Sequence, residues 1–388
     1  MARTAGPKGR ELRLDAFRGL ALIFIYLDHI PSNLLNWITI RNFGFSDATE
    51  IFIFISGYTA TVAYGNALRR RGFLFATSRI LRRCWQLYAA HIFLFVIFTA
   101  QIGYVAATFH NQMFAEEMNI TGFLSEPHVA LMQALLLRFM PANMDVLPLY
   151  IVLLLAFPLI LWGMQISRIG VLALSLALYV VARHFDWNIA TYPDGDWFFN
   201  PFAWQLLFVI GAACGKSHGT GERLTPAWPW LPWVALAYLV FAFLIVLTWH
   251  VPQLERFVPD LLQRFIYPID KSALDPLRLL HFLALAYLTV LLVPAGARIL
   301  DWRIVKPVIA CGQQSLYIFC AGIFLSFAAH FILEEINGST ATQIAVSAGG
   351  IVLMVALAYM ILWYKSSETA PALARAAEPS DGRVERAS

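Results

Sequence analysis

The sequence predicts an all-α polytopic membrane protein, and three observations support this prediction. Of the 388 residues, 59% are hydrophobic and only 13% are charged, whereas a typical soluble domain has about 25% charged residues. Apolar stretches of about 17–25 residues, the length that a helix needs to cross a bilayer, recur along the chain. The segments between these stretches carry nearly all the Lys and Arg residues. We therefore expect about ten transmembrane helices.

The expected spans divide the chain into three parts. A cytoplasmic segment, residues 1–13, precedes a membrane domain over residues 14–364. A tail over residues 365–388 lacks aromatic residues and is expected to be disordered. No cysteine pair lies in an exposed loop, so we expect no disulfide framework. The ten spans are predicted at residues 14–31, 46–67, 84–108, 146–165, 168–184, 200–215, 230–249, 276–295, 307–333 and 341–364.

The positive charges predict an orientation in the membrane. Of the 28 Lys and Arg residues, 20 lie in segments on the same side as the N-terminus and seven lie on the opposite side. Cytoplasmic segments of membrane proteins carry an excess of these residues, so both termini are expected in the cytoplasm. The net charge of +4 says little about partners, because in a membrane protein the position of each charge matters more than the sum. We expect the lipid bilayer as a partner and no nucleic acid.

The first span carries four ionisable side chains, Asp15, Arg18, Asp28 and His29. Eleven helical steps return to within about 20°, so Arg18 and His29 share a face and lie about 16 Å apart. Arg18 could hold a donor anion or a thioester carbonyl within the membrane. His29 could act as a general base, with Asp28 or a carboxylate from another span orienting its ring. The structural alternative is an ion pair of Arg18 with Asp15 and an interfacial histidine. Four such groups in one span favour function.

An acidic turn precedes the second span on the same side as His29. Ser46 is the expected N-cap, and Asp47 and Glu50 share a face in the first helical turn. Ordinary capping accounts for such a turn, since the helix dipole favours negative charge there. The short connection to His29 favours a catalytic contribution. Deeper in the span, Ser56-Gly57 permits close helix approach or a polar wall.

A loop with six arginines over residues 69–83 follows on the cytoplasmic side. Arg79 and Arg82 are three residues apart, so they point together and could clamp phosphates of a nucleotide such as coenzyme A. Arg83, Ser56 and Tyr58 are expected on the same donor route. The alternative is a topology signal with lipid headgroup contact.

Aromatic and polar residues gather on the opposite, outer side. Such groups bind carbohydrates by stacking and hydrogen bonding, although an interfacial aromatic belt gives a similar pattern. Arg278 and His281, at the start of a span, could reach the same cavity as His29. The candidate acceptor-binding residues are Trp197, Asn200, Trp204, Gln205, Lys271, Arg278 and His281.

Other chemistry finds less support in the sequence. No metal-ligand cluster, Walker loop or Gly-x-Ser-x-Gly motif occurs, so we expect no metal and no tightly bound cofactor. A transporter or flippase that uses the intramembrane charges as a proton relay is the alternative function. The absence of internal repeats and of paired broken helices counts against it. A purely structural role as a scaffold in the membrane would not explain why Arg18 and His29 lie within the first span.

Several sequence motifs resemble a known enzyme family. An arginine and a histidine separated by ten residues, followed by Arg79-x-x-Arg82, is similar to the acyltransferase-3 family of membrane acyltransferases. Longer stretches resemble its OpgC branch of succinyltransferases, which modify osmoregulated periplasmic glucans. These stretches are Asp15-Ala16-Phe17-Arg18-Gly19-Leu20, Leu27-Asp28-His29-Ile30-Pro31, Gly44-Phe45-Ser46-Asp47-Ala48, Ser56-Gly57-Tyr58, Phe199-Asn200-Pro201-Phe202-Ala203-Trp204-Gln205 and Asp270-Lys271.

The resemblance implies an enzyme in the bacterial inner membrane with a ten-helix fold. It implies acyl-CoA as cytoplasmic co-substrate, with succinyl-CoA expected, and a periplasmic glucan hydroxyl as acceptor. By the same resemblance Arg18 and His29 are the catalytic pair, and Arg79 and Arg82 bind the donor. Direct transfer and a covalent acyl-histidine intermediate both fit these residues.

Overall fold

Helices make up most of the structure. The computed structural model describes residues 11–217 and 228–377, and in these ranges the only extended pairing is an isolated bridge between Ala190 and Asp196. The all-α prediction is confirmed. The longer α-helices are α1 (Leu12–Asp28), α2 (Ala48–Thr108), α6 (Val146–Ile166), α7 (Arg168–His184), α8 (Pro201–Lys216), α9 (Leu231–His250), α11 (Pro276–Leu292), α13 (Ser315–Phe331) and α14 (Thr340–Ala377).

Short helices connect these elements. The short α-helices are α3 (Met113–Glu117), α4 (Thr121–Ser125), α5 (Pro127–Leu135), α10 (Asp260–Ile266) and α12 (Val305–Gln313). The short 3₁₀-helices are η1 (Leu34–Ile38), η2 (Ile40–Asn42), η3 (Pro252–Phe257) and η4 (Arg298–Asp301), and η5 (Ile332–Ile336) is a π-helix that extends α13.

Each predicted span falls on helix, but the helices do not all have transmembrane length. Five helical stretches in the described residues are long and apolar enough to cross a membrane: Ala48–Thr108, Val146–Ile166, Leu231–His250, Ser315–Ile336 and Thr340–Glu368. The protein is thus an all-α chain with membrane-spanning helices, and ten crossings stay a prediction. The predicted span 307–333 is divided at Gln314 into α12 and α13.

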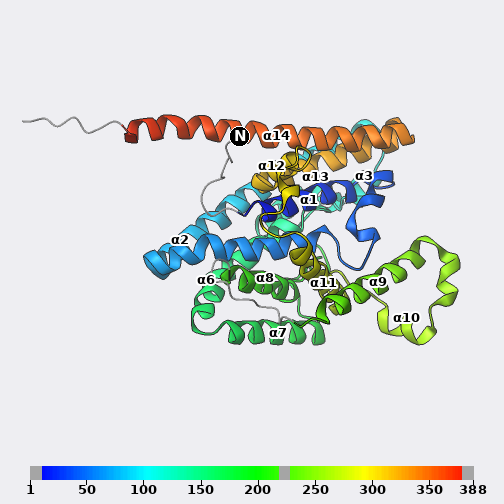
Figure 1. The fold of residues 1–388 in the computed structure, drawn as a ribbon. Helices are drawn as coiled ribbons and strands as arrows, with labels where there is room; N and C mark the ends of the chain where they lie inside the picture. Colours follow the sequence, from blue (N-terminus) through cyan, green and yellow to red (C-terminus); the bar gives the residue numbers. More distant parts are fainter. Residues whose placement is uncertain (1–10, 218–227, 378–388) are drawn as a thin grey trace, which may run out of the picture.

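The arginine-rich segment is helical, so the prediction of a loop over residues 69–83 is wrong. One helix, α2, includes both the second and the third predicted span, and only Gly72 inside it has non-helical dihedral angles. Its φ of 81° lies in the left-handed region that favours glycine. We call residues 48–71 and 73–108 the first and second arms of α2. Figure 1 shows the chain turning back between them.

The helices are stacked in a consistent order. In Figure 1, α14 lies along one side of the molecule with α12 and α13 against it, α1 and α2 follow, and α8, α6 and α7 lie on the far side. Helices α9 and α10 project at one end of the molecule. The two helices that carry the predicted catalytic residues, α1 and α2, therefore lie in the middle of the stack.

Glycines hold α1 and α2 close to their neighbours. A Cβ added at Gly19 on α1 would lie 1.9 Å from the carbonyl oxygen of Val308 on α12, and one at Gly312 would lie 1.8 Å from the carbonyl oxygen of Asp15. At Gly57 on α2, a Cβ would lie 2.0 Å from the carbonyl oxygen of Phe208 on α8. Such contacts are typical of helices that pack through small residues in membranes. The prediction of close approach at Gly57 is confirmed.

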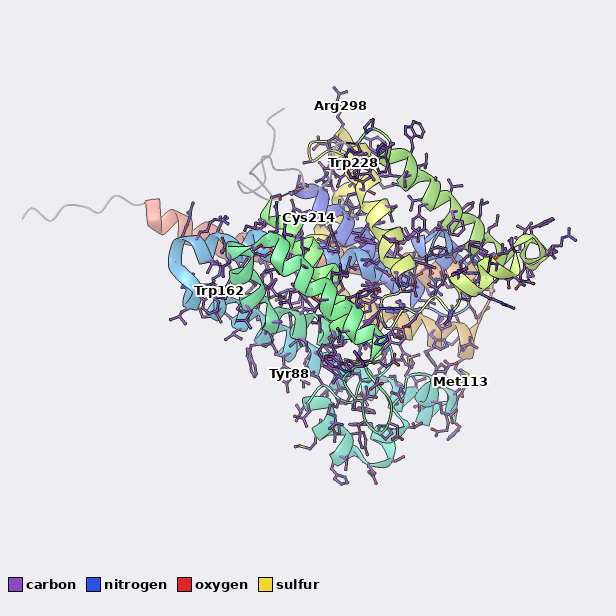
Figure 2. All side chains as sticks on the ribbon, turned by 90° about the horizontal axis from the view of Figure 1, so that it is seen from below. Tyr88, Met113, Trp162, Cys214, Trp228 and Arg298 are labelled. Atoms are coloured by element: carbon purple, nitrogen blue, oxygen red, sulfur yellow. The ribbon has the colours of Figure 1, made fainter. Side chains whose placement is uncertain are left out.

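The ends of the chain extend beyond the predicted membrane domain. Helix α14 continues to Ala377, so the first part of the predicted tail 365–388 is helical, while residues 378–388 and 1–10 lie outside the described residues. Large apolar side chains, such as Trp162 and Trp228, stand on the outside of the bundle (Figure 2), each about half exposed. Such a surface suits a lipid environment.

Candidate active site

Helix α1 directs Arg18 and His29 into two different pockets. His29 is the C-cap of α1, and its backbone N–H donates to the carbonyl oxygen of Ile25 at 3.1 Å. Arg18 lies eleven residues earlier on the same face, at the middle of the stack. We call the two cavities the Arg18 pocket and the His29 pocket.

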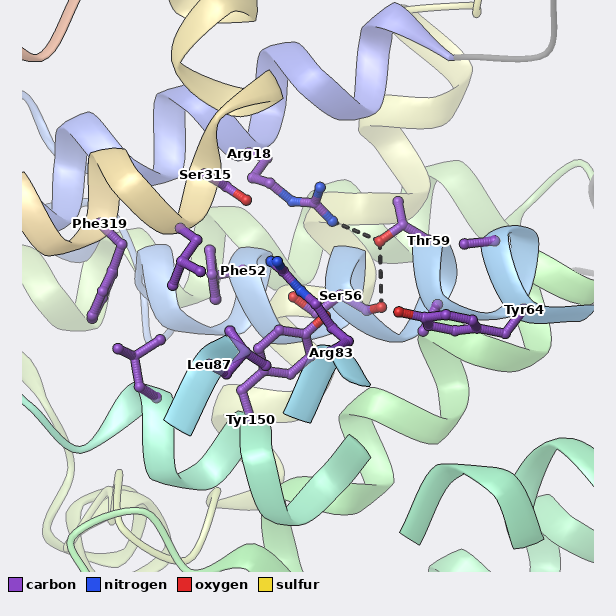
Figure 3. Close-up of a pocket in the computed structure, with 14 residues that line it drawn as sticks. Arg18, Phe52, Ser56, Thr59, Tyr64, Arg83, Leu87, Tyr150, Ser315 and Phe319 are labelled. Atoms are coloured by element: carbon purple, nitrogen blue, oxygen red, sulfur yellow. Dashed lines mark hydrogen bonds between the residues drawn. The ribbon is translucent and has the colours of Figure 1, made fainter. Parts of the chain in front are cut away.

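The Arg18 pocket has a volume of about 180 Å³ and lies between α1, both arms of α2, α6 and α13. Arg18 Nη2 donates to Thr59 Oγ1 at 2.6 Å, and Thr59 Oγ1 donates to the carbonyl oxygen of Ile55 at 2.8 Å. Arg18 and Arg83 both extend into this pocket (Figure 3). Its lining residues are Arg18, Phe52, Ser56, Thr59, Ala60, Ala63, Tyr64, Arg83, Leu87, Leu147, Tyr150, Ser315, Leu316 and Phe319.

None of the lining residues named above is acidic, although two are arginines. Two guanidinium groups in a partly enclosed site, without a lining carboxylate, favour an anionic or strongly polarised ligand. Arg18 comes from α1 and Arg83 from the second arm of α2, which the turn at Gly72 brings back beside the first arm.

The predicted donor-binding residues separate into two groups. Arg83 and Ser56 line the Arg18 pocket, whereas Arg79 and Arg82 are exposed. The Arg79 guanidinium carbon lies 5.9 Å from the ring centroid of Tyr64, a lining residue, so Arg79 is close to the pocket. The Tyr58 hydroxyl donates to Glu11 Oε2 at 3.3 Å.

Thr59 is a lining residue that the sequence analysis missed. It lies three residues after Ser56, on the same face of α2, and this spacing could have identified it. Its hydroxyl accepts the hydrogen bond from Arg18 and so fixes where the guanidinium points.

The His29 pocket is larger, about 330 Å³, and lies between the end of α1, the start of α2, the end of α9 and the start of α11. His29 Nδ1 is buried and has no hydrogen-bond partner among the described residues. Asp28 Oδ1 accepts from Thr39 Oγ1 at 2.7 Å. The structure thus gives Asp28 a hydroxyl partner from the loop. The lining residues are Ile25, Asp28, His29, Arg41, Asn42, Gly44, Phe45, Ser46, Asp47, Ala48, Thr49, Trp249, His250, Ile269, Lys271 and Arg278.

A four-residue ion-pair network closes one side of the His29 pocket. Lys271 Nζ lies 2.6 Å from Asp47 Oδ2, and Arg278 Nη2 lies 3.1 Å from the same oxygen and 2.7 Å from Glu50 Oε1. The Glu50 side chain is fully buried. Burial alone would raise the pKa of Asp47, but Lys271 and Arg278 outweigh burial and hold this pKa well below its usual range.

The same acidic residues also cap α2. The N-cap is Asp47 rather than Ser46, so the predicted N-cap is wrong by one residue. Asp47 Oδ1 accepts from the backbone N–H of Thr49 at 2.8 Å, and Glu50 Oε2 accepts from the backbone N–H of Asp47 at 2.9 Å. The sequence left ordinary capping and a catalytic contribution as the alternatives for this turn, and the structure shows the capping bonds together with ion pairs to Arg278.

Ser46 bonds to His281 instead of capping the helix. Ser46 Oγ and His281 Nδ1 are 2.7 Å apart, and the Ser46 backbone N–H donates to the same nitrogen at 3.3 Å. Gly44 leaves room for this ring, because a Cβ there would lie 1.9 Å from His281 Nε2. His281 therefore ties α11 to the start of α2, beside the pocket.

A family model described as "OpgC protein" matches residues 10–366 of the chain. The chain belongs to the OpgC family. No curated protein and no solved structure matches it. The matched range includes both pockets, the ion-pair network and all the candidate residues. Membership of the OpgC family supports an acyltransferase role for the chain.

Five of the predicted acceptor-binding residues of this OpgC chain do not line the His29 pocket. They are Trp197, Asn200, Trp204, Gln205 and His281, and all five are buried. Asn200 caps α8, and Gln205 Oε1 accepts from Ser175 Oγ at 2.6 Å.

Two of these buried residues, Asn200 and Trp204, support the loop that carries Lys271. Trp204 Nε1 donates to the carbonyl oxygens of Lys271 and Ser272 at 3.1 and 3.0 Å. The Asn200 backbone N–H donates to the Ser272 carbonyl oxygen at 3.0 Å, and Lys271 Nζ lies 5.6 Å from the ring centroid of Phe199. In this OpgC chain the motif at residues 199–205 therefore holds Lys271, one of the cationic side chains that line the His29 pocket, in position.

The two OpgC pockets are neighbours along α2. Thr49 lines the His29 pocket, and Phe52, three residues later, lines the Arg18 pocket. The Phe52 ring packs against Tyr150 and Phe319, with centroid separations of 6.4 and 6.1 Å. Slightly less than one helical turn, roughly 4.5 Å along the axis, therefore separates the nearest lining residues of the two pockets on α2.

Proposed function

We propose that this protein is a membrane O-acyltransferase that carries an acyl group between the two pockets. The donor is acyl-CoA from the cytoplasmic side, with succinyl-CoA expected, and the acceptor is a hydroxyl of a periplasmic glucan. The observation that carries the proposal is the placement of Arg18 and His29. They share one face of α1, yet they line two pockets that only about one turn of α2 separates.

The charge of the Arg18 pocket supports binding of the donor there. Acyl-CoA carries several phosphate charges and a polarised thioester carbonyl, and guanidinium groups are well suited to both. Arg79 and Arg82 are exposed at the end of the second arm of α2 nearest Gly72, where they can meet phosphates. Arg83 and Arg18 follow further in, so the pantetheine arm reaches Arg18 after the phosphates are bound.

The position of His29 supports its role as the base. A neutral imidazole can accept the proton of a sugar hydroxyl, whose oxygen then attacks the thioester carbonyl carbon. The ester C–O bond forms, the C–S bond breaks, and the proton passes from His29 to the sulfur, so that coenzyme A leaves as a thiol. Arg18 lies in the other pocket and can hold polar groups of the donor arm while the thioester extends toward His29.

Thiol release tests the proposal. Purified protein incubated with succinyl-CoA and glucan should release coenzyme A and form a succinyl ester on the glucan, both in equal amounts. A transporter should release no thiol and should instead move glucan across a vesicle membrane. His29→Ala should lower ester formation by about 10²–10⁴-fold, the range typical for loss of a general base.

The control is a histidine of similar chemistry outside the pockets. His184 ends α7 and is exposed, so His184→Ala should keep full activity. Full activity of His29→Ala would contradict the proposal.

A further inference from the structure

Exposed aromatic rings stand at the rim of the His29 pocket, and the proposed function does not yet use them. Trp249 and His250 end α9 and line the pocket. The Trp249 side chain is 45% exposed. Trp37 in η1 is 52% exposed and packs on the His250 ring with 4.4 Å between ring centroids.

The Trp249 ring is held by its neighbours. Its Nε1 donates to the Tyr267 hydroxyl, and its ring lies beside the Phe45 ring with a centroid separation of 6.4 Å. Phe45 is buried, so it supports the ring from the protein side. A fixed, half-exposed indole loses little conformational freedom when a ligand packs on it.

The interior of the same pocket supplies polar groups. Asp28, Arg41, Asn42 and Lys271 line it. The C–H bonds on one face of a sugar ring pack on the electron-rich face of an aromatic ring, while the hydroxyls need donors and acceptors. An aromatic rim above a polar interior matches both requirements, and about 330 Å³ is within the usual size of a small-molecule site.

We propose that Trp249 and Trp37 form a stacking subsite for the acceptor saccharide, which presents a hydroxyl to His29. This inference rests on the proposed function and names the residues that bind its acceptor. It differs from the expectation for Trp197 and Trp204, which are both buried, and Trp204 Nε1 donates to the carbonyl oxygen of Lys271. The other explanation for exposed Trp residues, an interfacial belt, does not require Trp249 to line a pocket or Trp37 to pack on a residue that lines it.

Acceptor kinetics test the subsite. Trp249→Ala and Trp37→Ala should each raise the KM for glucan by about tenfold, because one aromatic stacking contact is typically worth 5- to 150-fold in binding. The KM for succinyl-CoA and its slow hydrolysis without glucan should stay unchanged. Trp249→Phe, which keeps a stacking face, should stay within about threefold of the native KM for glucan.

Trp233 provides the matched control. It lies near the other end of the same helix, is 71% exposed and does not line the pocket. Trp233→Ala should leave the KM for glucan unchanged. A belt of membrane anchors predicts the same effect at Trp233 as at Trp249, and that result would overturn the subsite.

The outcomes separate this inference from the proposed function. If the native protein esterifies glucan but the KM for glucan is unchanged in Trp249→Ala and Trp37→Ala, the subsite is wrong and the function stands. If the native protein forms no ester on any saccharide, the proposed function fails first. Should Trp249→Ala lose its fold, Trp37→Ala and Trp249→Phe decide the question, because Trp37 lies in an exposed turn.

Discussion

The Arg18 pocket and the His29 pocket share two helices but differ in their charge. The Arg18 pocket has two guanidinium groups and no acidic lining residue. The His29 pocket is lined by three cationic side chains together with Asp28 and Asp47. Glu50, which is fully buried and does not line the pocket, forms an ion pair with one of these cations, Arg278. The first pocket is suited to hold an anion, and the second pocket, whose charges are balanced, is suited to a neutral ligand beside a base.

For the proposed transfer, this difference favours chemistry between the pockets. The charges favour an anionic donor on one side of Phe52 and an uncharged hydroxyl on the other, and the proposal then requires the thioester near the boundary. Residues of the Arg18 pocket should then affect mainly the binding of the donor, and residues of the His29 pocket mainly turnover and the binding of the acceptor. Mutations can test this division.

The largest expected effect is a loss of activity that differs in kind between variants of His29 and of Arg18. His29→Gln should lower turnover by about 10²–10⁴-fold while the Kd for acyl-CoA changes less than about twofold. Arg18→Gln should also weaken binding of acyl-CoA, by about 10- to 150-fold, because a hydrogen bond from a charged group typically contributes 1.5–3 kcal/mol. Equilibrium binding and single-turnover rates measure the two effects.

Equal losses of donor affinity in His29→Gln and Arg18→Gln would mean that the pockets act as one site. A matched change elsewhere on α1 gives the baseline. Leu20 is partly buried and lines neither pocket, so Leu20→Met should leave both measurements near native values.

Much of the fold could be predicted because apolar length and charge placement are local properties of the sequence. Every predicted span falls on helix, and the tight approach at Gly57 follows from a small residue in an apolar span. The loop over 69–83 was predicted wrongly because a run of arginines is compatible with both loop and helix. The reversal needs only one residue, Gly72, to leave the helical conformation.

The candidate site could be predicted only in part. Arg18 and His29 lie in the first predicted span, where ionisable side chains are costly, so their presence there indicated a site. The roles of Trp204 and Trp249 could not be distinguished in the same way, because both are aromatic residues at span ends. Their difference depends on tertiary packing, which buries Trp204 and leaves Trp249 at the pocket.

The next largest effect should come from the ion-pair network of the His29 pocket. Arg278→Ala leaves buried Glu50 without its cation and should destabilise the fold by about 3–5 kcal/mol. The double variant Glu50→Gln with Arg278→Met should recover much of this loss, because no uncompensated charge remains. Equilibrium unfolding in detergent measures both. If Arg278→Ala had native stability, the network would not hold α11 to α2.

A smaller effect is expected from the wall between the pockets. Phe52→Trp enlarges the ring that separates them and should lower transfer by about tenfold, with an overpacking cost of about 1–3 kcal/mol. The Kd for acyl-CoA and the KM for glucan should change little. Phe324→Trp, on an exposed part of α13, is the control. Unchanged transfer in Phe52→Trp would place the acyl group's path elsewhere.

The smallest effect distinguishes exposed arginines from the arginine inside the Arg18 pocket. The double variant Arg79→Ala with Arg82→Ala should weaken acyl-CoA binding a few-fold at about 0.05 M salt and hardly at all at about 0.5 M, because salt screens exposed charges. Arg83→Ala should weaken binding at both concentrations, since its guanidinium lines the pocket. Titration of acyl-CoA at the two concentrations measures this difference. A salt-independent loss in the double variant would instead place the phosphates in close contact with Arg79 and Arg82, and so move the donor site toward the turn at Gly72.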